Sequence, residues 1–380
     1  MNFELTKDQK MLKEEVRKFA ENEIAPLAAE IDESGRFPKE SIQKLADMGL
    51  LGIIVPEKYG GSEFDFISLS IAVEEISRTC ASTGVITAVN NSLCTYPILK
   101  WGTEEQKQKY LPPLCSGEKI GAIGITEPNA GSDVVAMETT AVLDGEEYVL
   151  NGAKRFITNG TEAGTFVVFA FTDKEAKHKG ISTFIVERDT PGFTLGKHEN
   201  LMGVRATGNC ELIFEDCRIP RENLLGEIGQ GFYMCMNILD GSRIDIGAQA
   251  VGIAQAALDD AIQYSKERIT FGKPICKHQM IQNLLAEMAS QIHAARLMVH
   301  YAAWCKDNGI KKFTKEAAMA KYYSATIAVD VTRKALQIYG GYGYTKDYAV
   351  ERYYRDAKIL ELYEGTMEVQ KIVIAGELVK

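Results

Sequence analysis

The amino-acid sequence predicts an α+β fold in which a compact β region lies between two helical regions. Apolar residues recur at spacings of three and four up to about residue 118 and again from about residue 226, which is typical of amphipathic helices. Between these regions the period changes, and short apolar runs are separated by Asp, Lys, Gly and Pro, as in a series of strands. We therefore predict three domains, at residues 1–118, 119–225 and 226–380.

The first region begins with a helix-start signal. Thr6 and Gln9 have the spacing of a capping box, in which each side chain bonds the backbone N–H of the other residue. An apolar face follows over residues 11–20, and residues 67–77 and 104–111 repeat its spacing. Each of these segments is expected to be a helix.

The middle region opens with residues 120–125, an uncharged run that predicts a buried strand. Asp144-Gly145 then separates two apolar runs, which is a good hairpin signal because Gly and Asp tolerate the left-handed backbone of a tight turn. Further strands are predicted at residues 165–171, 181–186 and 211–214.

The last region predicts long helices. An apolar stripe over residues 281–299 is typical of a packed helix face rather than of a cofactor site. Asp240 and Ser242 favour helix N-termini, so an Ala-rich helix is expected to follow them, and Thr314 is expected to cap another helix running towards Gln337. Strands and helices do not alternate, and neither GxGxxG nor GxxxxGK[ST] occurs, so no doubly wound nucleotide-binding sheet is predicted.

Composition limits the class of protein. The 380 residues are 46% apolar and 25% charged, as in ordinary globular proteins, and carry a formal net charge of -9. That charge argues against a general nucleic-acid or anionic-membrane surface, and no apolar run is long enough to span a bilayer. The eight cysteines are scattered singly, which suggests neither a zinc site nor a disulfide framework. With no leader before the first helix signal, the expected compartment is the cytoplasm.

The turn at residues 126–133, Thr-Glu-Pro-Asn-Ala-Gly-Ser-Asp, directly follows the first predicted strand. A turn rich in Pro, Gly and Ser at a strand end presents backbone N–H groups and hydroxyls, which suits a ligand carrying carbonyls or phosphates. A polar surface loop has the same composition, so these residues alone leave both interpretations open.

Glu364 is a candidate general base. It lies between two apolar-periodic segments, and Gly365 interrupts the helix and can let Glu364 face a cavity. A carboxylate in an apolar pocket has a raised pKa, which suits proton abstraction near neutral pH. A solvated glutamate in an interhelical turn is the commoner case, and the local sequence does not exclude it.

Three further segments each allow two interpretations. Arg243 follows helix-capping residue types and either meets a phosphate or lies on the surface. Arg268 either reaches a dinucleotide pyrophosphate or complements the negative end of the preceding helix. The glycines of residues 337–343 either permit close backbone approach to a ligand or form a plain turn.

Taken together, these segments resemble the motifs of the acyl-CoA dehydrogenase family, in the family's order and over essentially the whole chain. The matching segments are residues 126–133, 156–160, 202–205, 240–243, 268–272, 337–343 and 363–366. The chain is most similar to the bacterial short-chain, butyryl-CoA type. The resemblance implies an N-terminal helical domain, a barrel-like middle β domain and a C-terminal four-helix bundle. It also implies FAD bound between the last two domains, in a homotetramer built from two dimers.

The resemblance further implies roles for individual residues. Glu364 would be the catalytic base, and Thr158 would bond near the reactive N5 of the flavin. Contacts with the acyl-CoA or enoyl-CoA substrate are implied for Ser132, Asp240, Arg243 and Gly365. FAD contacts, several of them from a neighbouring subunit, are implied for Ile123, Ile125, Thr126, Ser132, Phe156, Ile157, Thr158, Arg268, Thr270, Phe271, His278, Gln279, Gln337, Gly340, Gly341, Thr366 and Glu368.

The implied reaction belongs to fatty acid metabolism. Glu364 removes the α proton of a saturated thioester while the flavin accepts hydride from the β carbon and passes electrons to electron-transferring flavoprotein. Hydrogen bonds to the thioester carbonyl stabilise the developing enolate. Some family members carry the base at the position of Ser242, but a serine cannot act as a carboxylate base. Met367 departs from the family pattern, where Asn or Ser is more usual.

The sequence leaves the direction of the reaction and the acyl group open. A similar enzyme can run as an enoyl-CoA reductase, even within a flavin-bifurcating complex, and an aryl- or branched-chain enoyl-CoA reductase is the nearest alternative. A non-catalytic CoA-binding paralogue and an oxygen-consuming oxidase are further alternatives. The chain-length preference depends on the depth of the acyl pocket, and therefore on side chains such as those of residues 85–99.

Overall fold

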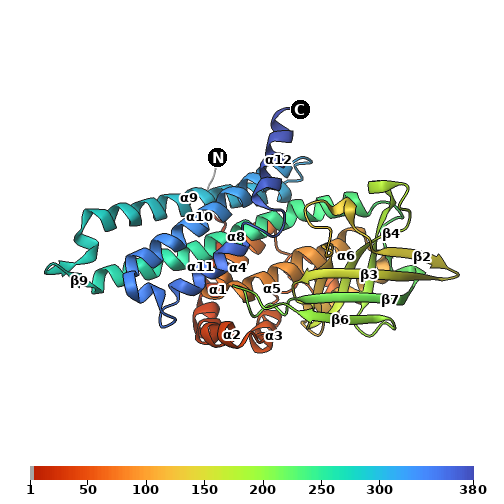
Figure 1. Cartoon of the computed structure of the whole chain (residues 1–380), viewed down its shortest axis with the longest axis horizontal. Helices are drawn as coiled ribbons and strands as arrows, with labels where there is room; N and C mark the ends of the chain where they lie inside the picture. The colour runs from red at the N-terminus through yellow and green to blue at the C-terminus, as the bar shows by residue number, and fades with distance from the viewer. Residues whose placement is uncertain (1–3) are drawn as a thin grey trace.

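The computed structural model describes residues 4–380, and its helical and β regions follow one another along the long axis (Figure 1). Helices continue to Cys115, strands lie between Ile120 and Leu225, and helices return from Gly231. The predicted α+β fold class is therefore confirmed. Residues 1–3 of the first predicted domain lie outside the described part, and the domain boundaries at 118/119 and 225/226 stay predictions.

The N-terminal region is a set of short helices, and its first helix starts as predicted. The Thr6 backbone N–H donates to Gln9 Oε1 (3.0 Å), and the Gln9 N–H donates to Thr6 Oγ1 (3.2 Å). The elements are α1 (Lys7–Phe19), η1 (Ala20–Ile24), η2 (Ala25–Leu27), α2 (Ala28–Ser34), α3 (Lys39–Asp47), η3 (Glu57–Tyr59), α4 (Phe66–Thr79), α5 (Ala81–Ala88), η4 (Val89–Thr95), α6 (Tyr96–Trp101) and α7 (Glu104–Cys115).

Within this region, η4 is wound as a π-helix, and all of its residues are buried. π-Helical turns are rare and are found mostly at functional sites, because the extra residue in the turn displaces side chains from ordinary helical positions. The element belongs to residues 85–99, the segment expected to influence the depth of the acyl pocket.

The middle region is one eight-stranded sheet with the order β6-β7-β3-β2-β4-β5-β8, and β1 pairs in parallel with β4. Its strands are β1 (Ile120–Gly124), β2 (Thr140–Asp144), β3 (Glu147–Ile157), β4 (Ala163–Phe171), β5 (Ile181–Glu187), β6 (Phe193–His198), β7 (Cys210–Pro220) and β8 (Leu224–Leu225). The predicted hairpin is β2–β3, and the other predicted strands lie within β1, β4, β5 and β7. Strand β6 was not predicted, because Phe-Thr-Leu-Gly-Lys-His has only a weak apolar alternation.

The sheet separates two hydrophobic cores. Along β4, Phe166 and Val168 point into a core made by the sheet alone, whereas Val167 and Phe169 join the core shared with the helices. Residues of every strand from β1 to β7 contribute to the core made by the sheet alone, so the sheet curves around that core. The second core, which Val167 and Phe169 share with the helices, packs the other face of the sheet against the helical regions.

The C-terminal region packs three long helices, α8 (Gly231–Glu267), α9 (Gln279–Asp307) and α10 (Thr314–Tyr339), with α11 (Val350–Ile359) and α12 (Met367–Leu378) (Figure 1). The hairpin β9 (Ile269–Thr270) and β10 (Lys273–Pro274) joins α8 to α9. As predicted, Met288, Ile292 and Val299 of the α9 stripe are buried.

One predicted helix start is wrong, and one predicted cap does not form although its helix begins where expected. Asp240 and Ser242 lie inside α8, which begins at Gly231, and they do not cap it. Thr314 is the first residue of α10, but it makes no cap, because its hydroxyl donates to Asp240 Oδ2 (2.6 Å). In both cases long-range partners use the side chains that the local sequence assigns to capping.

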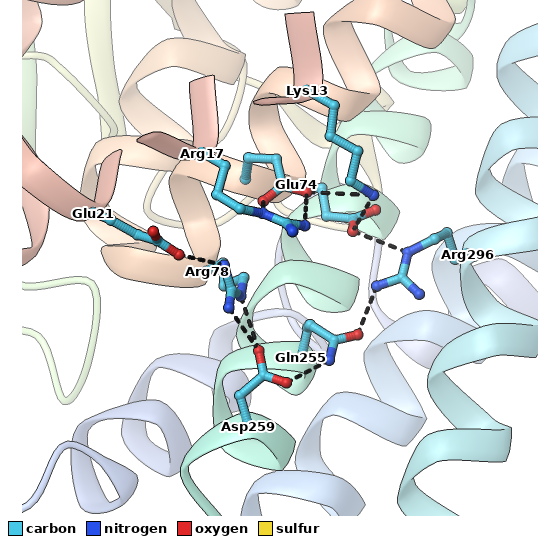
Figure 2. Close-up of polar contacts among 9 residues, drawn as sticks. Lys13, Arg17, Glu21, Glu74, Arg78, Gln255, Asp259 and Arg296 are labelled. Atoms are coloured by element: carbon cyan, nitrogen blue, oxygen red, sulfur yellow. Dashed lines mark hydrogen bonds and ion pairs between the residues drawn. The ribbon is translucent and has the colours of Figure 1, made fainter. Parts of the chain in front are cut away.

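A network of charged side chains around the buried Glu74 ties the N-terminal helices to the C-terminal bundle (Figure 2). Glu74 of α4 accepts from Arg296 of α9 (2.9 Å) and lies 3.9 Å from Lys13 of α1. Arg78 of α4 pairs with Asp259 of α8 (2.9 Å). Since a buried carboxylate is costly unless it is paired, the contacts of Glu74 favour one register of α1, α4 and α9.

The cysteines are free thiols, all buried except Cys276, which is partly exposed, as the scattered spacing predicted. Among residues 4–380, no helix is long and apolar enough to cross a membrane. The same residues contain no group of three or more His, Cys, Asp or Glu side chains that could hold a metal ion.

Candidate active site

Glu364 lies in the tight turn between α11 and α12. Its φ of 53° is in the left-handed region, which is uncommon for a residue with a side chain, and Gly365 follows with a φ of 87°. Such a conformation is costly unless the surroundings hold it in place, and it occurs most often at functional sites.

The Glu364 carboxylate has a defined partner. Ser242 Oγ, on α8, donates to Glu364 Oε2 over 2.5 Å. Burial raises the pKa of the Glu364 carboxyl, while Ser242 and the positive charges of Lys321 and Arg243 act in the opposite direction. The side chain is partly exposed by its accessible surface, so the carboxylate lies in an interhelical turn, where a hydroxyl orients it.

The turn around Glu364 is held by side chains that sequence reasoning missed. Lys321 Nζ donates to the Gly365 carbonyl (2.7 Å), and Gln370 Nε2 donates to the carbonyls of Glu364 (2.9 Å) and Gly365 (3.0 Å). The preceding Tyr363 donates its hydroxyl hydrogen to Gln249 of α8. Burial lowers the pKa of Lys321 to about 8. The one local signal for it is a lysine among the alanines of the α10 sequence.

Asp240 and Arg243 lie one helical turn apart on α8, next to this turn. Arg243 Nη1 contacts Asp240 Oδ1 at 2.7 Å, and only 4% of the Arg243 side chain is exposed. The surface interpretation of Arg243 is therefore wrong. Its Nε is buried and has no acceptor among residues 4–380, so one donor of this guanidinium remains available to a ligand.

The turn at residues 126–133 is held in place by hydrogen bonds of Glu127 to the neighbouring chain segments. Glu127 accepts from the backbone N–H groups of Glu138 (2.5 Å) and Thr139 (3.1 Å) and from the fully buried Lys154 (2.7 Å). Its backbone closes on Ala130 through a pair of hydrogen bonds. With the inner side fixed in this way, Ser132 is exposed at the outer side of the turn.

Phe156 projects from a bulge in β3. The register with β7 shifts between Lys154 and Ile157, and Phe156 has a φ of 58° and a half-exposed ring. Ile157 is buried, while Thr158 is partly exposed just past the strand end. A positive φ is uncommon at a bulky residue and is costly unless the surroundings hold it in place.

Cys235 of α8 relates the sheet to the Glu364 turn. Burial raises the pKa of its thiol to about 12; Glu364 adds to the increase, and the charges of Lys154 and Arg243 oppose it. Charges from β3 and from the Glu364 turn thus act on the same buried thiol of α8.

A second set of predicted residues gathers at the other end of α8. Arg268, Thr270, His278, Gly340 and Gly341 line one open cavity of about 720 Å³ together with three tyrosines. His278 Nε2 and Thr270 Oγ1 are 3.1 Å apart. A Cβ at either glycine would meet nothing within 4 Å, so the backbone there faces open space. Beside it, Phe271 is 96% exposed, and Gln279 and Gln337 are exposed as well.

The two sets lie far apart in one chain. Figure 1 shows β9 at the left end of the long helices and the eight-stranded sheet at the right end. Ile123, Ile125, Thr126, Ser132 and the β3 bulge belong to the sheet end. Thr366 caps α12 beside Glu364, and Glu368 is exposed in the first turn of that helix.

The donor sets suit the two halves of a flavin dinucleotide. Apolar side chains with neighbouring hydroxyls, as at Ile125, Phe156 and Thr158, suit a flat ring with polar edges. An arginine beside open glycine backbone, as at Arg268 and Gly340, suits a pyrophosphate. The residues present therefore fit FAD.

Comparison with known proteins covers the whole chain. Family models described as acyl-CoA dehydrogenase, N-terminal, middle and C-terminal domains match residues 6–118, 122–217 and 229–379. The "Acyl-CoA dehydrogenase, short-chain specific" of Clostridium acetobutylicum is 53% identical over 378 residues, covering 100% of each chain.

Two solved structures superpose closely on it. One is the butyryl-CoA dehydrogenase of Megasphaera elsdenii, at 47% identity and a TM-score of 0.98, covering 100% of each chain. The other comes from work described as "Electron transferring flavoprotein of Acidaminococcus fermentans: Towards a mechanism of flavin-based electron bifurcation", at 50% identity and a TM-score of 0.99, again with 100% of each chain covered. On this agreement of sequence, fold and site, the chain belongs to the acyl-CoA dehydrogenase family.

Proposed function

We propose that this oxidoreductase interconverts a short-chain acyl-CoA thioester, such as butyryl-CoA, and its α,β-unsaturated counterpart, with FAD as the redox cofactor and Glu364 as the base. The observation that carries the proposal is the Glu364 carboxylate, which is partly buried, raised in pKa and hydrogen-bonded by Ser242 at 2.5 Å. The names of the similar proteins, a short-chain acyl-CoA dehydrogenase and a butyryl-CoA dehydrogenase, support the choice of substrate.

In this proposal, Glu364 takes the proton from the α carbon of the bound thioester. Ser242 occupies only Oε2 of the carboxylate, so Oε1 is available to the substrate. Lys321 and Gln370 hold the carbonyls of the turn and so fix its backbone, while Ser242 orients the carboxylate. The raised pKa lets the base operate near neutral pH.

Binding of the CoA portion is assigned to Asp240, Arg243 and Ser132, and the acyl end to Gly365. The buried Nε of Arg243, which has no acceptor among the described residues, supports an anionic or carbonyl ligand at that position. The FAD contacts predicted from the sequence are proposed unchanged. FAD supplies the acceptor for the hydride equivalent that leaves the β carbon.

A homotetramer built from two dimers is proposed because the predicted FAD contacts lie at opposite ends of one chain (Figure 1). A second copy can bring the Arg268 end of one bundle to the sheet end of the other. Electron-transferring flavoprotein is proposed as the redox partner, supported by the description of a closely similar structure. The free thiols support a reducing compartment, which we propose is the cytoplasm.

Replacement of Glu364 by glutamine tests the proposal. The Glu364→Gln variant is expected to purify with FAD bound, because no FAD contact is assigned to this side chain, but to show no bleaching of the flavin when butyryl-CoA is added anaerobically. Loss of the base typically lowers such a rate by ~10²–10⁴-fold. Flavin absorbance in a stopped-flow cell measures the rate.

Glu361→Gln is the matched control, since Glu361 lies on the same turn but pairs with Lys358 (2.5 Å). It should bleach like the parent protein. Retained bleaching in Glu364→Gln would remove Glu364 from the role. A faster reaction with aryl- or branched-chain esters than with butyryl-CoA would favour the reductase alternatives. Rapid oxygen consumption in the presence of substrate would favour an oxidase. A colourless protein that cannot be reconstituted with FAD would favour a non-catalytic paralogue.

A further inference from the structure

Lys306, in the last turn of α9, places its ammonium group inside the protein without a hydrogen-bond acceptor among residues 4–380. The Nζ atom lies 3.6 Å from the ring centre of Phe66 and 4.1 Å from that of Tyr96. It also lies directly against α8, because a Cβ added to Gly241 would come within 2.3 Å of it. Aromatic faces attract a cation but do not satisfy its N–H donors.

The charged groups around Lys306 already have other partners. Asp240 forms the ion pair with Arg243 described above. The Asp307 carboxylate accepts from the first two backbone N–H groups of α4, at 2.7 and 3.1 Å. Lys100 donates to the side chain of Asn237 (2.6 Å). The remaining opposite charge near Lys306 is Asp245, whose attraction opposes the decrease in the Lys306 pKa that burial causes.

Asp245 lies on α8, one turn beyond Gly241, and is 3% exposed. Burial raises the pKa of its carboxyl, which Ser92 of η4 and Lys306 oppose. Asp245 and Lys306, both within the described part, attract each other but form no direct ion pair. A buried acid and a buried base are thus held near each other and only partly satisfied.

This pair lies beside the part of α8 that contacts Glu364. Asp245 is three residues beyond Ser242, hence on a neighbouring part of the same α8 face, and Glu364 is near enough to raise its pKa. Lys306 Nζ lies against Gly241, the residue before Ser242, so Glu364, Asp245 and Lys306 all adjoin the same two turns of α8. Ser92 and Tyr96, which face the pair, belong to residues 85–99, and Ser92 lies on the buried π-helix η4.

We propose that Asp245 and Lys306 form a charged stop at the inner end of the acyl pocket and restrict the enzyme to short acyl groups. The inference rests on the proposed function. Each added methylene normally improves binding in an apolar pocket, so chain length is limited only where the pocket ends in something costly to displace. A longer chain here would have to remove the remaining solvation or attraction of two buried charges, which apolar carbons cannot replace.

The test removes both charges together, because a single substitution would leave the other charge buried and unpaired. The variant Asp245→Val/Lys306→Met replaces the pair by apolar side chains. Anaerobic flavin bleaching is measured with butyryl-, hexanoyl- and octanoyl-CoA for the holoenzyme. The ratio of the second-order rate constants of bleaching for hexanoyl- and butyryl-CoA should rise at least about tenfold over the parent protein, which corresponds to ~1.4 kcal/mol.

A second variant, Asp245→Asn/Lys306→Met, keeps the volume of the acid nearly unchanged, so it separates charge from space and serves if the first variant does not fold. Its ratio should rise in the same direction. Asp259→Asn, on α8 but in the network of Figure 2, is the control and should keep the parent's chain-length profile.

The outcomes separate the two proposals. If none of the acyl-CoA esters bleaches the flavin of the parent protein, the proposed function fails. If it bleaches with butyryl-CoA and both double variants, folded and loaded with FAD, keep the parent's hexanoyl-to-butyryl ratio, the charged stop is overturned. A parent that already prefers hexanoyl- to butyryl-CoA would overturn it as well.

Discussion

At the scale of single residues, the Glu364–Ser242 contact sets the pH range in which the base can act. Burial raises the pKa of Glu364, and the Ser242 hydroxyl limits the increase because its hydrogen bond favours the ionised carboxylate. A base must be deprotonated to accept a proton, so the rate is lost as pH falls through this pKa. Removal of the hydroxyl should therefore move the loss of activity to higher pH.

The Ser242→Ala variant is expected to show this displacement in the pH profile of flavin bleaching by butyryl-CoA. A hydrogen bond to a charged group is worth ~1.5–3 kcal/mol, so the rate at a pH below the transition should fall about tenfold or more, while the rate at high pH changes little. Ser290→Ala, an exposed position on α9, is the control. An equal decrease at every pH would mean that Ser242 positions the base without tuning its pKa.

The sequence could supply Glu364 but not its environment. The residue types and the glycine after it gave a candidate base, and the family resemblance gave the role. Lys321, Gln370 and Ser242 surround it through contacts spanning up to 122 residues of sequence. No local periodicity records which helix a lysine or glutamine will face, so these positioning groups became visible only in three dimensions.

At the scale of elements, α8 packs so closely on α4 that one position admits no side chain. A Cβ at Gly252 would lie 2.3 Å from the Glu74 carbonyl oxygen and 3.0 Å from the Arg78 backbone nitrogen. Both neighbours are backbone atoms of a packed helix that also carries the charges of Figure 2, so they cannot move aside cheaply. The glycine therefore sets the distance between the two helices.

Gly252→Ala should lower the free energy of unfolding by about 1–3 kcal/mol, the usual cost of overpacking, despite the better helix propensity of alanine. Gly376→Ala is the matched control, because a Cβ added to that α12 glycine would have no heavy atom within 4 Å. There the substitution should be neutral or stabilise by ~0.5–1 kcal/mol. Thermal or denaturant unfolding of the two variants measures the difference; equal effects would contradict the close contact.

Element prediction succeeded where local and tertiary signals agree. The capping box at Thr6, the hairpin at Asp144-Gly145 and the stripe of α9 were found because neighbouring residues determine them. The start of α8 was misplaced because Asp240 and Ser242, good capping types, are used by Arg243, Thr314 and Glu364 instead. Asp240 and Ser242 are therefore polar residues of the candidate active site inside a buried helix, and they do not mark the start of that helix.

At the scale of the whole molecule, the predicted FAD contacts form two groups near opposite ends of the chain (Figure 1). The sequence order of the motifs carries no distance, so this division could not be seen before the fold was known. The cavity around Arg268 and the strongly exposed Phe271 lie on the far end of the bundle, away from Glu364. In the proposed dimer each FAD site combines Glu364 from one subunit with Arg268 from the other.

This arrangement predicts complementation between two defective chains. Glu364→Gln lacks the base, and Arg268→Ala lacks a proposed pyrophosphate contact, so each should be nearly inactive alone. In a mixed dimer, one site receives Glu364 from the second chain and Arg268 from the first and is intact, while the other site carries both defects. Random pairing of equal amounts makes half of the dimers mixed, so co-expression should restore about a quarter of the parent activity. Activity no greater than the sum of the separate variants would show that both residues serve a site within one chain.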